Sequence, residues 1–184
     1  MAKIKSPLNL LCGKGKVTNQ THYIYFHQEN IYVSNGNVAI KQRMELHGFT
    51  KADMRNLDGI CIHKDVFKII KNKEMSMGLG SITIEILGLS IIRIPFLPTY
   101  EVHGGKQLIK QIDKSFDTFE MVKTSEVAIN PDYITLLRKV MVTESSGFTF
   151  RFNEATGGVL VTPNKSNLKE HAMITPLVIT GELC

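Results

Sequence analysis

The sequence lacks the features that mark membrane and secreted proteins. No run of about 18 apolar residues occurs within its 184 positions, so no segment has the length and hydrophobicity of a transmembrane helix. The N-terminal residues Met1–Lys5 include two lysines and no apolar stretch, which differs from the pattern of a secretory signal peptide. These absences predict a cytoplasmic protein that has no membrane partner.

Cysteine is scarce and histidine is scattered. The three cysteines, Cys12, Cys61 and Cys184, are odd in number and widely spaced, which indicates reduced thiols rather than a disulfide framework or a paired-cysteine metal site. Of the six histidines, His22 and His27 are closest, and their odd separation places the two side chains on opposite faces of a strand. The sequence therefore predicts no metal site and no cofactor.

Patterns that accompany catalysis are missing as well. A phosphate-binding loop needs Ser or Thr after its GxxxxGK motif, whereas Val17 follows Lys16 in this chain. Acidic residues occur singly, without the paired spacing that acid-base catalysis favours. We predict that the protein is not an enzyme. An enzyme or small-ligand binder whose residues assemble only in space is a further alternative, and a metal or cofactor retained on purification would indicate it.

The charge balance favours a polyanionic partner. The formal net charge is +5 and the sequence pI is about 9.1. Apolar residues make up 43% of the chain, which is enough for a folded core and too much for a disordered protein.

A repeat organises the chain. Val127–Ile129 is predicted to end a strand, with Asn130 as helix N-cap and Pro131 as the first residue of a helix that runs to Met141. A similar pattern of residues occurs 67 positions earlier, formed by Ile62, His63, Asp65, Phe67, Ile69, Ile70 and Lys71. Each copy precedes a pair of alternating strands, at 81–87 with 89–96 and at 148–152 with 158–162. The repeat predicts an α+β fold in which a short helix packs on antiparallel strands in each unit.

The remaining segments complete a predicted domain plan. A hairpin is expected from Tyr23–Phe26 and Ile31–Val33, and further strands from 38–46, 59–62, 118–127 and 172–179, the last with Pro176 at an edge or bulge. Residues 48–58 are expected to form a loop. Residues 1–98 are predicted to form one domain, 99–117 a linker with a helix, and 118–184 a second, partial domain.

Three predicted helices combine an apolar side with a basic side. On a helical wheel Lys64, Lys68 and Lys71 lie together, opposite the apolar residues Val66, Phe67, Ile69 and Ile70. Lys106, Lys110 and Lys114 follow one another at intervals of four, and Arg138 and Lys139 lie on the polar side of the third helix. Like charges at these spacings repel, so they indicate either a face that meets an anion or a merely solvated one.

Four motifs, in order, resemble the bacterial sliding clamp, the β subunit of the replicative DNA polymerase. Ile31–Ile40 resembles its ATDGHRLA strand-turn-strand signature, and Phe96–Tyr100 resembles its FPDY interdomain segment. Ile129–Leu137 is similar to its FNxxYLxxxL helix start, and His171–Ile179 is similar to its C-terminal YVVMPMRL segment. The similarity extends over most of the chain from Tyr23 to Ile179.

The resemblance implies a DNA-clamp-like fold, in which helices line a channel around double-stranded DNA and hold phosphates without reading sequence. It implies a homo-oligomer and a surface pocket for short peptide motifs of DNA polymerase or repair proteins. The DNA-binding residues would be Lys64, Lys68, Lys71, Lys106, Lys110, Lys114, Arg138 and Lys139. The peptide-binding residues would be Gly36, Asn37, Val38, Ala39, Met173, Thr175, Pro176 and Leu177; ordinary turn and edge-strand packing is the alternative for this second set.

The chain also departs from the clamp pattern. Asn35 and Asn37 stand where the signature has Asp and His, and 175–178 reads Thr-Pro-Leu-Val in place of Met-Pro-Met-Arg, which puts the family's peptide specificity in doubt. With about half the repeated units of a clamp protomer, the chain would need more subunits than a dimer to close a ring. A clamp-fold interaction module that does not encircle DNA is therefore the alternative.

Overall fold

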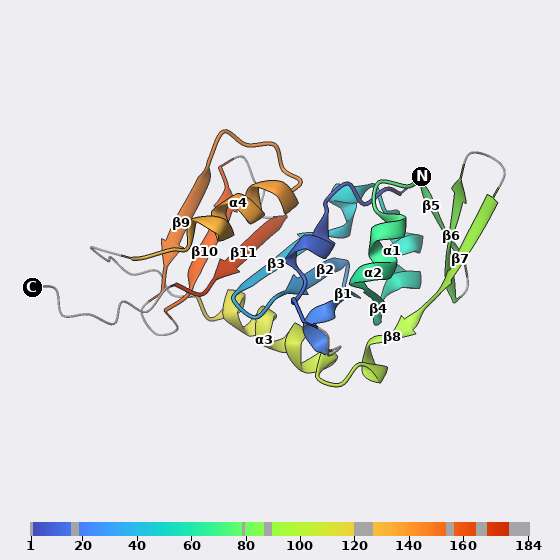
Figure 1. Cartoon of the computed structure of the whole chain (residues 1–184), viewed down its shortest axis with the longest axis horizontal. Helices are drawn as coiled ribbons and strands as arrows, with labels where there is room; N and C mark the ends of the chain where they lie inside the picture. Colours follow the sequence, from blue (N-terminus) through green and yellow to red (C-terminus); the bar gives the residue numbers. More distant parts are fainter. Residues whose placement is uncertain are drawn as a thin grey trace, which may run out of the picture.

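A computed structural model describes residues 2–15, 19–78, 80–86, 90–119, 127–153, 157–164 and 169–176 (Figure 1). Within these ranges, one sheet of eight antiparallel strands extends through both halves of the chain, in the spatial order β8-β4-β1-β2-β3-β11-β10-β9. Its strands are β1 (Tyr23–His27), β2 (Asn30–Ser34), β3 (Val38–Arg43), β4 (Ile60–His63), β8 (Leu97–Pro98), β9 (Phe148–Phe152), β10 (Val159–Pro163) and β11 (Glu170–Ile174). A smaller sheet contains β5 (Met75–Gly78), β6 (Ser81–Ile86) and β7 (Ser90–Pro95).

In the described part of the chain, four α-helices and four 3₁₀ segments accompany the sheets. The α-helices are α1 (Lys51–Leu57), α2 (Lys64–Ile70), α3 (Gly105–Asp117) and α4 (Pro131–Val140). The 3₁₀ segments are η1 (Leu8–Leu11), η2 (Gln20–His22), η3 (Met44–His47) and η4 (Thr99–Glu101). The described residues thus have the predicted mixture of helix and antiparallel sheet.

The large sheet has apolar side chains on both faces, because successive strand residues point to opposite sides. In β1, Ile24 and Phe26 belong to a core that includes buried residues of η1, α1, α2 and α4. Tyr25, between them, belongs to a second core with Ile109 and Ile112 of α3. The helices α2 and α4 therefore cover one face of the sheet and α3 covers the other, as Figure 1 shows.

The predicted repeat is confirmed at the start of its two helices. His63 caps α2 by accepting a hydrogen bond from the Asp65 amide at 3.3 Å, and Asn130 caps α4 by accepting one from the Asp132 amide at 2.9 Å. Antiparallel pairs follow both helices, β6 with β7 and β9 with β10. The two pairs differ in their surroundings, because β10 continues into the large sheet through β11 whereas β6 and β7 belong to the smaller one.

Several segment predictions need correction. The expected loop at 48–58 contains α1, whose capping box joins Thr50 and Asp53. The strand expected to reach residue 46 ends at Arg43, and η3 begins at Met44. Residues 127–129 have no strand assignment, and most of the strand expected at 118–127 lies outside the described residues. Ile69, expected on the buried side of α2, is 47% exposed because the seven-residue helix ends one position later.

A buried polar cluster joins β3, β11 and the end of α4. Glu170 is fully buried, and its carboxylate accepts hydrogen bonds from the amides of Val142 at 2.8 Å and Thr143 at 2.9 Å. The Gln42 side chain donates to Glu170 and, at 2.9 Å, to the Val140 carbonyl. These bonds fix the join between β3 and β11, where the two halves of the sheet meet.

The same cluster includes a histidine that is neutral at physiological pH. Nε2 of His47 lies 3.2 Å from Oε1 of Gln42, an acceptor, so this nitrogen carries the proton. Burial lowers the pKa of His47 to about 4, with a smaller contribution from the charge of Lys5. The oxygen of the Gln42 amide thus accepts from His47, while its nitrogen donates to Glu170 and to the Val140 carbonyl.

Candidate peptide and nucleic-acid interfaces

One hollow collects six of the eight residues predicted to bind a peptide. It has a volume of about 280 Å³ and is called here the β3–β11 hollow. Its walls include Gly36, Asn37, Val38, Ala39, Met173 and Thr175. Pro176 is half-buried and does not line the hollow, and Leu177 lies outside the described residues. Two segments far apart in the sequence thus meet in one hollow, and peptide binding there stays a prediction.

Local hydrogen bonds shape the turn that forms one wall. Asn35 Oδ1 accepts from the amides of Asn37 at 2.9 Å and Val38 at 2.8 Å, so the side chain holds a tight Asx turn. Gly36 has a φ of 96°, which favours glycine at this position. The Asn35 that departs from the clamp signature therefore still supplies the acceptor that the turn needs.

Strand pairing brings the second wall to the first. Ala39 in β3 lies opposite Met173 in β11, and the Thr175 amide donates to the Asn37 carbonyl at 2.8 Å just beyond the strand. Because register fixes which side chains share a face, Ala39 and Met173 point to the same side of the sheet, toward α3.

Helix α3 supplies a third wall that the sequence did not predict. Its contribution consists of Leu108, Gln111, Ile112 and Ser115, and η2 adds Gln20 and Thr21 at the rim. The apolar side of the predicted helix at 106–116 was the available signal. What the sequence could not give was the sheet face on which that side would pack.

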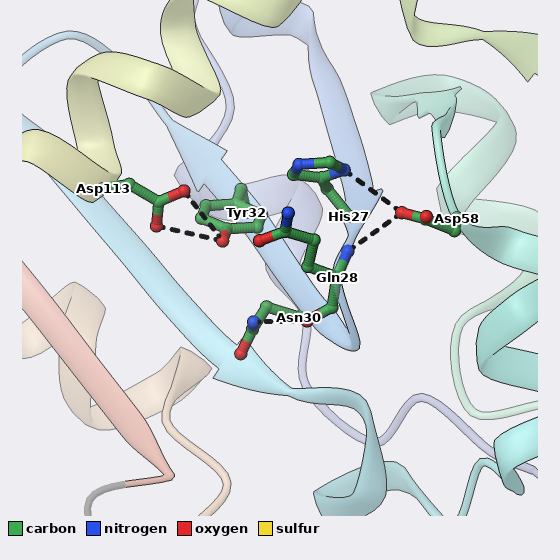
Figure 2. Close-up of polar contacts among 6 residues, drawn as sticks. All are labelled: His27, Gln28, Asn30, Tyr32, Asp58 and Asp113. Carbon is green, nitrogen blue, oxygen red and sulfur yellow. Dashed lines mark hydrogen bonds and ion pairs between the residues drawn. The ribbon is translucent and has the colours of Figure 1, made fainter.

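A charged clasp holds α3 against the sheet (Figure 2). The Tyr32 hydroxyl of β2 donates to both carboxylate oxygens of Asp113 on α3, at 3.0 and 3.2 Å. Lys41 Nζ lies 2.5 Å from Asp113 Oδ1 and 5.4 Å from the centre of the Tyr32 ring. Burial, together with the Asp113 charge, raises the pKa of Tyr32 well above its usual range, so the phenol stays a donor.

Figure 2 also shows how the β1–β2 hairpin is tied to the end of α1. Asp58 Oδ1 lies 3.1 Å from His27 Nδ1 and accepts a hydrogen bond from the Gln28 amide at 2.9 Å. Gln28 and Glu29 adopt positive φ values of 45° and 64° in this tight turn, as a two-residue hairpin requires. The hairpin was predicted, and the Asp58 contact explains its anchoring.

Helices α2 and α4, which carry predicted cations, lie on the same face of the large sheet. The segment η1 contacts both helices, and the surface made by α2, η1 and α4 is called here the α2–α4 face. Arg138 and Lys139 are exposed in the last turn of α4, and Lys68 is exposed on α2. This face also contains a hollow of about 700 Å³ beside η1, with Lys14 and Lys139 in its lining.

The cations of α2 are partly engaged within the protein. Lys64 Nζ donates to the Gly13 carbonyl at 2.7 Å, and Lys68 Nζ lies 2.7 Å from Asp65 Oδ1. Lys71 is half-buried and caps the helix rather than continuing its wheel. The exposed Lys68–Asp65 pair is of the kind that contributes less than about 1 kcal/mol, so Lys68 can exchange this partner for another anion.

The three lysines of α3 occupy the other side of the sheet. Lys106, Lys110 and Lys114 are exposed, but Ile109 and Ile112 of their helix pack against the face of the sheet that turns away from α2 and α4. Lys106 Nζ lies 5.7 Å from the centre of the Tyr100 ring. The resemblance implies that the basic helices line one channel, and α3 departs from this because it lies on the other face of the sheet from α2 and α4. Contact of any of the eight cations with DNA stays a prediction.

The described residues offer little for covalent or metal chemistry. Among them, no group of three or more His, Cys, Asp or Glu is placed to hold a metal ion. Cys12 and Cys61 are buried free thiols, and burial raises the pKa of each to about 12. None of the described helices has the length and apolar character needed to cross a membrane.

Two solved structures are similar to this fold. A crystal structure of a DnaN sliding clamp (DNA polymerase III subunit beta) from Bartonella birtlesii bound to griselimycin matches with a TM-score of 0.54 and 12% identity, over 93% of this chain and 62% of that one. The DNA polymerase III beta subunit from Thermotoga maritima matches with a TM-score of 0.51 and 10% identity, over 98% of this chain and 63% of that one.

These comparisons show the fold and how much of a sliding clamp the chain spans. The predicted clamp-like α+β fold is confirmed by both likenesses. The chain spans less than two thirds of the length of either clamp. No family model and no curated protein matches the sequence. At such low identity the likeness shows the fold alone, and function has to be argued from the residues of this chain.

Proposed function

We propose that this protein is a non-enzymatic, clamp-like tether. In this proposal the β3–β11 hollow binds short peptide segments of DNA polymerase or repair proteins, and the α2–α4 face contacts the phosphates of double-stranded DNA without reading its sequence. The observation that carries the proposal is the hollow itself, which collects residues 36–39, Met173 and Thr175 from distant segments. Buried free thiols fit the reducing cytoplasm in which we place the protein.

The arrangement suits a tether because its two surfaces lie on opposite faces of the large sheet, and they approach each other only at the turn, where Asn37 lines both the β3–β11 hollow and the hollow beside η1. A protein that links a partner to DNA needs sites that can be filled together, and the large sheet lies between α3 with its hollow and the α2–α4 face. Phosphate contacts from exposed side chains such as Arg138 and Lys139 would be weak, multiple and salt-dependent, which allows movement along a duplex. Encirclement of the duplex would require several copies of the chain.

An interaction module that binds peptides but not DNA is the second candidate. The observations that favour it are the internal partners of Lys64 and Lys68, together with the position of α3 on the other side of the sheet. Both candidates use the β3–β11 hollow, and they differ only in whether the α2–α4 face binds duplex.

The hollow is tested by Met173→Ala and a labelled nonapeptide, Gln-Gln-Gly-Leu-Leu-Phe-Gly-Gln-Gln, whose apolar centre suits the apolar walls. We expect saturable binding to the unaltered protein by fluorescence anisotropy. The Met173 side chain forms one apolar wall. Removing it should weaken binding about tenfold, because the lost apolar contact is worth about 1.4 kcal/mol of binding free energy.

Met77→Ala is the matched control. Met77 is also a half-buried methionine in a strand, but β5 belongs to the smaller sheet, outside the hollow. The affinity of Met77→Ala for the nonapeptide should stay within about twofold of that of the unaltered protein. Absence of any saturable binding, or equal losses in the two variants, would remove the basis for a peptide site in the β3–β11 hollow.

A further inference from the structure

A second hollow follows the β3–β11 hollow along the same pair of strands. Its volume is about 360 Å³, and it is called here the basic hollow. Its lining consists of Asn30, Lys41, Arg43, Phe116, Asp117, Leu160, Lys169 and His171. The last turn of α3 borders it, just as the middle turns of α3 border the β3–β11 hollow.

The register of β3 and β11 makes the two hollows one track. Ala39 lies opposite Met173, and two residues further along each strand Lys41 lies opposite His171. Another two residues on, the Arg43 amide donates to the Lys169 carbonyl at 2.8 Å. Side chains two apart share a face and are separated by about 7 Å, so the track changes from apolar to basic within about 13 Å.

Among the described residues, the lining of the basic hollow has more cations than carboxylates. It contains Lys41, Arg43 and Lys169 and one carboxylate, that of Asp117, and of these cations Lys41 is already paired with Asp113 of α3. Arg43 pairs with Glu29 at 2.7 Å and Lys169 pairs with Glu45 at 2.8 Å, and neither carboxylate belongs to the lining. These carboxylates are 48% and 41% exposed, so both pairs are surface pairs that an incoming anion can rearrange at little cost.

We propose that the peptide bound in the β3–β11 hollow carries acidic residues two to four positions from its apolar anchor, and that Arg43 and Lys169 bind them. The inference rests on the proposed function, because it needs a peptide in the first hollow. Charge complementarity identifies the occupant: an extended chain with its apolar side chains beside Met173 places neighbouring carboxylates over the cations. The walls of Phe116 and Leu160 favour the same peptide over a bare phosphate chain, because they leave apolar surface to cover.

The test compares two probes on the full chain. One is the neutral nonapeptide above, and the other is its acidic form, Glu-Glu-Gly-Leu-Leu-Phe-Gly-Glu-Glu, with carboxylates at both ends because the direction of binding is open. In low salt we expect the acidic probe to bind about tenfold tighter, as a small number of partly exposed ion pairs would give. The preference should diminish as salt is raised.

The variant that removes the preference is R43Q/K169Q. Its acidic-over-neutral ratio should fall below about threefold, while its affinity for the neutral probe stays within about twofold of the unaltered protein. The matched control is K51Q/R55Q, which also removes one lysine and one arginine, from exposed positions of α1 outside both hollows. This control should keep the tenfold preference.

Four other results would overturn the inference. Equal binding of the two probes to the unaltered protein, with the neutral probe bound, overturns the acidic preference and leaves the peptide site standing. Failure of both probes to bind overturns this inference together with the proposed function. Equal losses of the acidic preference in R43Q/K169Q and K51Q/R55Q would show a general charge effect, and the assignment to Arg43 and Lys169 would be wrong. A loss of oligothymidylate binding in R43Q/K169Q without loss of the acidic preference would assign the basic hollow to nucleic acid.

Discussion

Replacing Glu170 by alanine is expected to lower the free energy of unfolding by about 3–5 kcal/mol, because one buried and two half-buried donors lose a fully buried acceptor at once. These donors are the amides of Val142 and Thr143 and the side-chain nitrogen of Gln42. The Glu170 side chain itself is fully buried, so water cannot take the place of its carboxylate without opening the join between β3 and β11. Urea unfolding at neutral pH measures the change.

Glu170→Gln and Glu45→Ala make this prediction specific. The glutamine keeps one acceptor oxygen and should cost less than the alanine, about 1–3 kcal/mol, which secures a measurement if the alanine variant does not fold. Glu45 is exposed and pairs with Lys169, so Glu45→Ala should cost less than about 1 kcal/mol. Similar losses for Glu45→Ala and Glu170→Ala would mean that the buried cluster does not hold the two halves of the sheet together.

Removing three cations from the α2–α4 face is expected to weaken binding to a 30-base-pair duplex by about 30-fold at low salt. The variant combines Lys68→Gln, Arg138→Gln and Lys139→Gln, all at exposed positions, and leaves Lys64 bonded to the Gly13 carbonyl. Each lost phosphate contact should also reduce the slope of log affinity against log salt by about 0.9. Anisotropy of a labelled duplex at several salt concentrations gives both quantities.

A triple variant of α3 is the matched comparison. Lys106→Gln, Lys110→Gln and Lys114→Gln remove the same number of charges from the opposite side of the sheet. We expect this variant to lose less than about threefold in duplex affinity, through net charge alone. A larger loss in the α3 variant than in the α2–α4 variant would place DNA on the other face. No duplex binding by the unaltered protein would favour the interaction module.

Local chemistry made part of the fold predictable. Asn130 followed by Pro131 specifies a helix start from side-chain hydrogen bonding and a fixed φ, and the matching His63 and Asp65 revealed its repeat. The turn at 34–37 could be predicted because the Asn35 side chain bonds to nearby amides in the same way. By contrast α1 was predicted as a loop, because its few apolar residues are spread among polar ones; the capping box of Thr50 and Asp53 was the signal that could have identified it.

The packing of distant segments against one another could not be predicted from the sequence. The amphipathic pattern of α3 specifies that Ile109 and Ile112 are buried, but either face of the sheet could receive them. The clasp of Asp113 with Tyr32 and Lys41 joins positions more than 70 residues apart, and no local pattern connects them. For the same reason the sequence predicted two walls of the β3–β11 hollow through family resemblance and missed the third.

A tether of this kind requires a peptide site and a DNA site on opposite faces of the sheet that can be filled together. The most direct measurement is the affinity of the labelled neutral nonapeptide with and without a saturating concentration of unlabelled 30-base-pair duplex. We expect an unchanged affinity for the peptide and a higher anisotropy plateau, because the label then moves with a larger ternary complex. Displacement of the nonapeptide by the duplex would rule out a tether with two separate sites, since the two ligands would then share one surface.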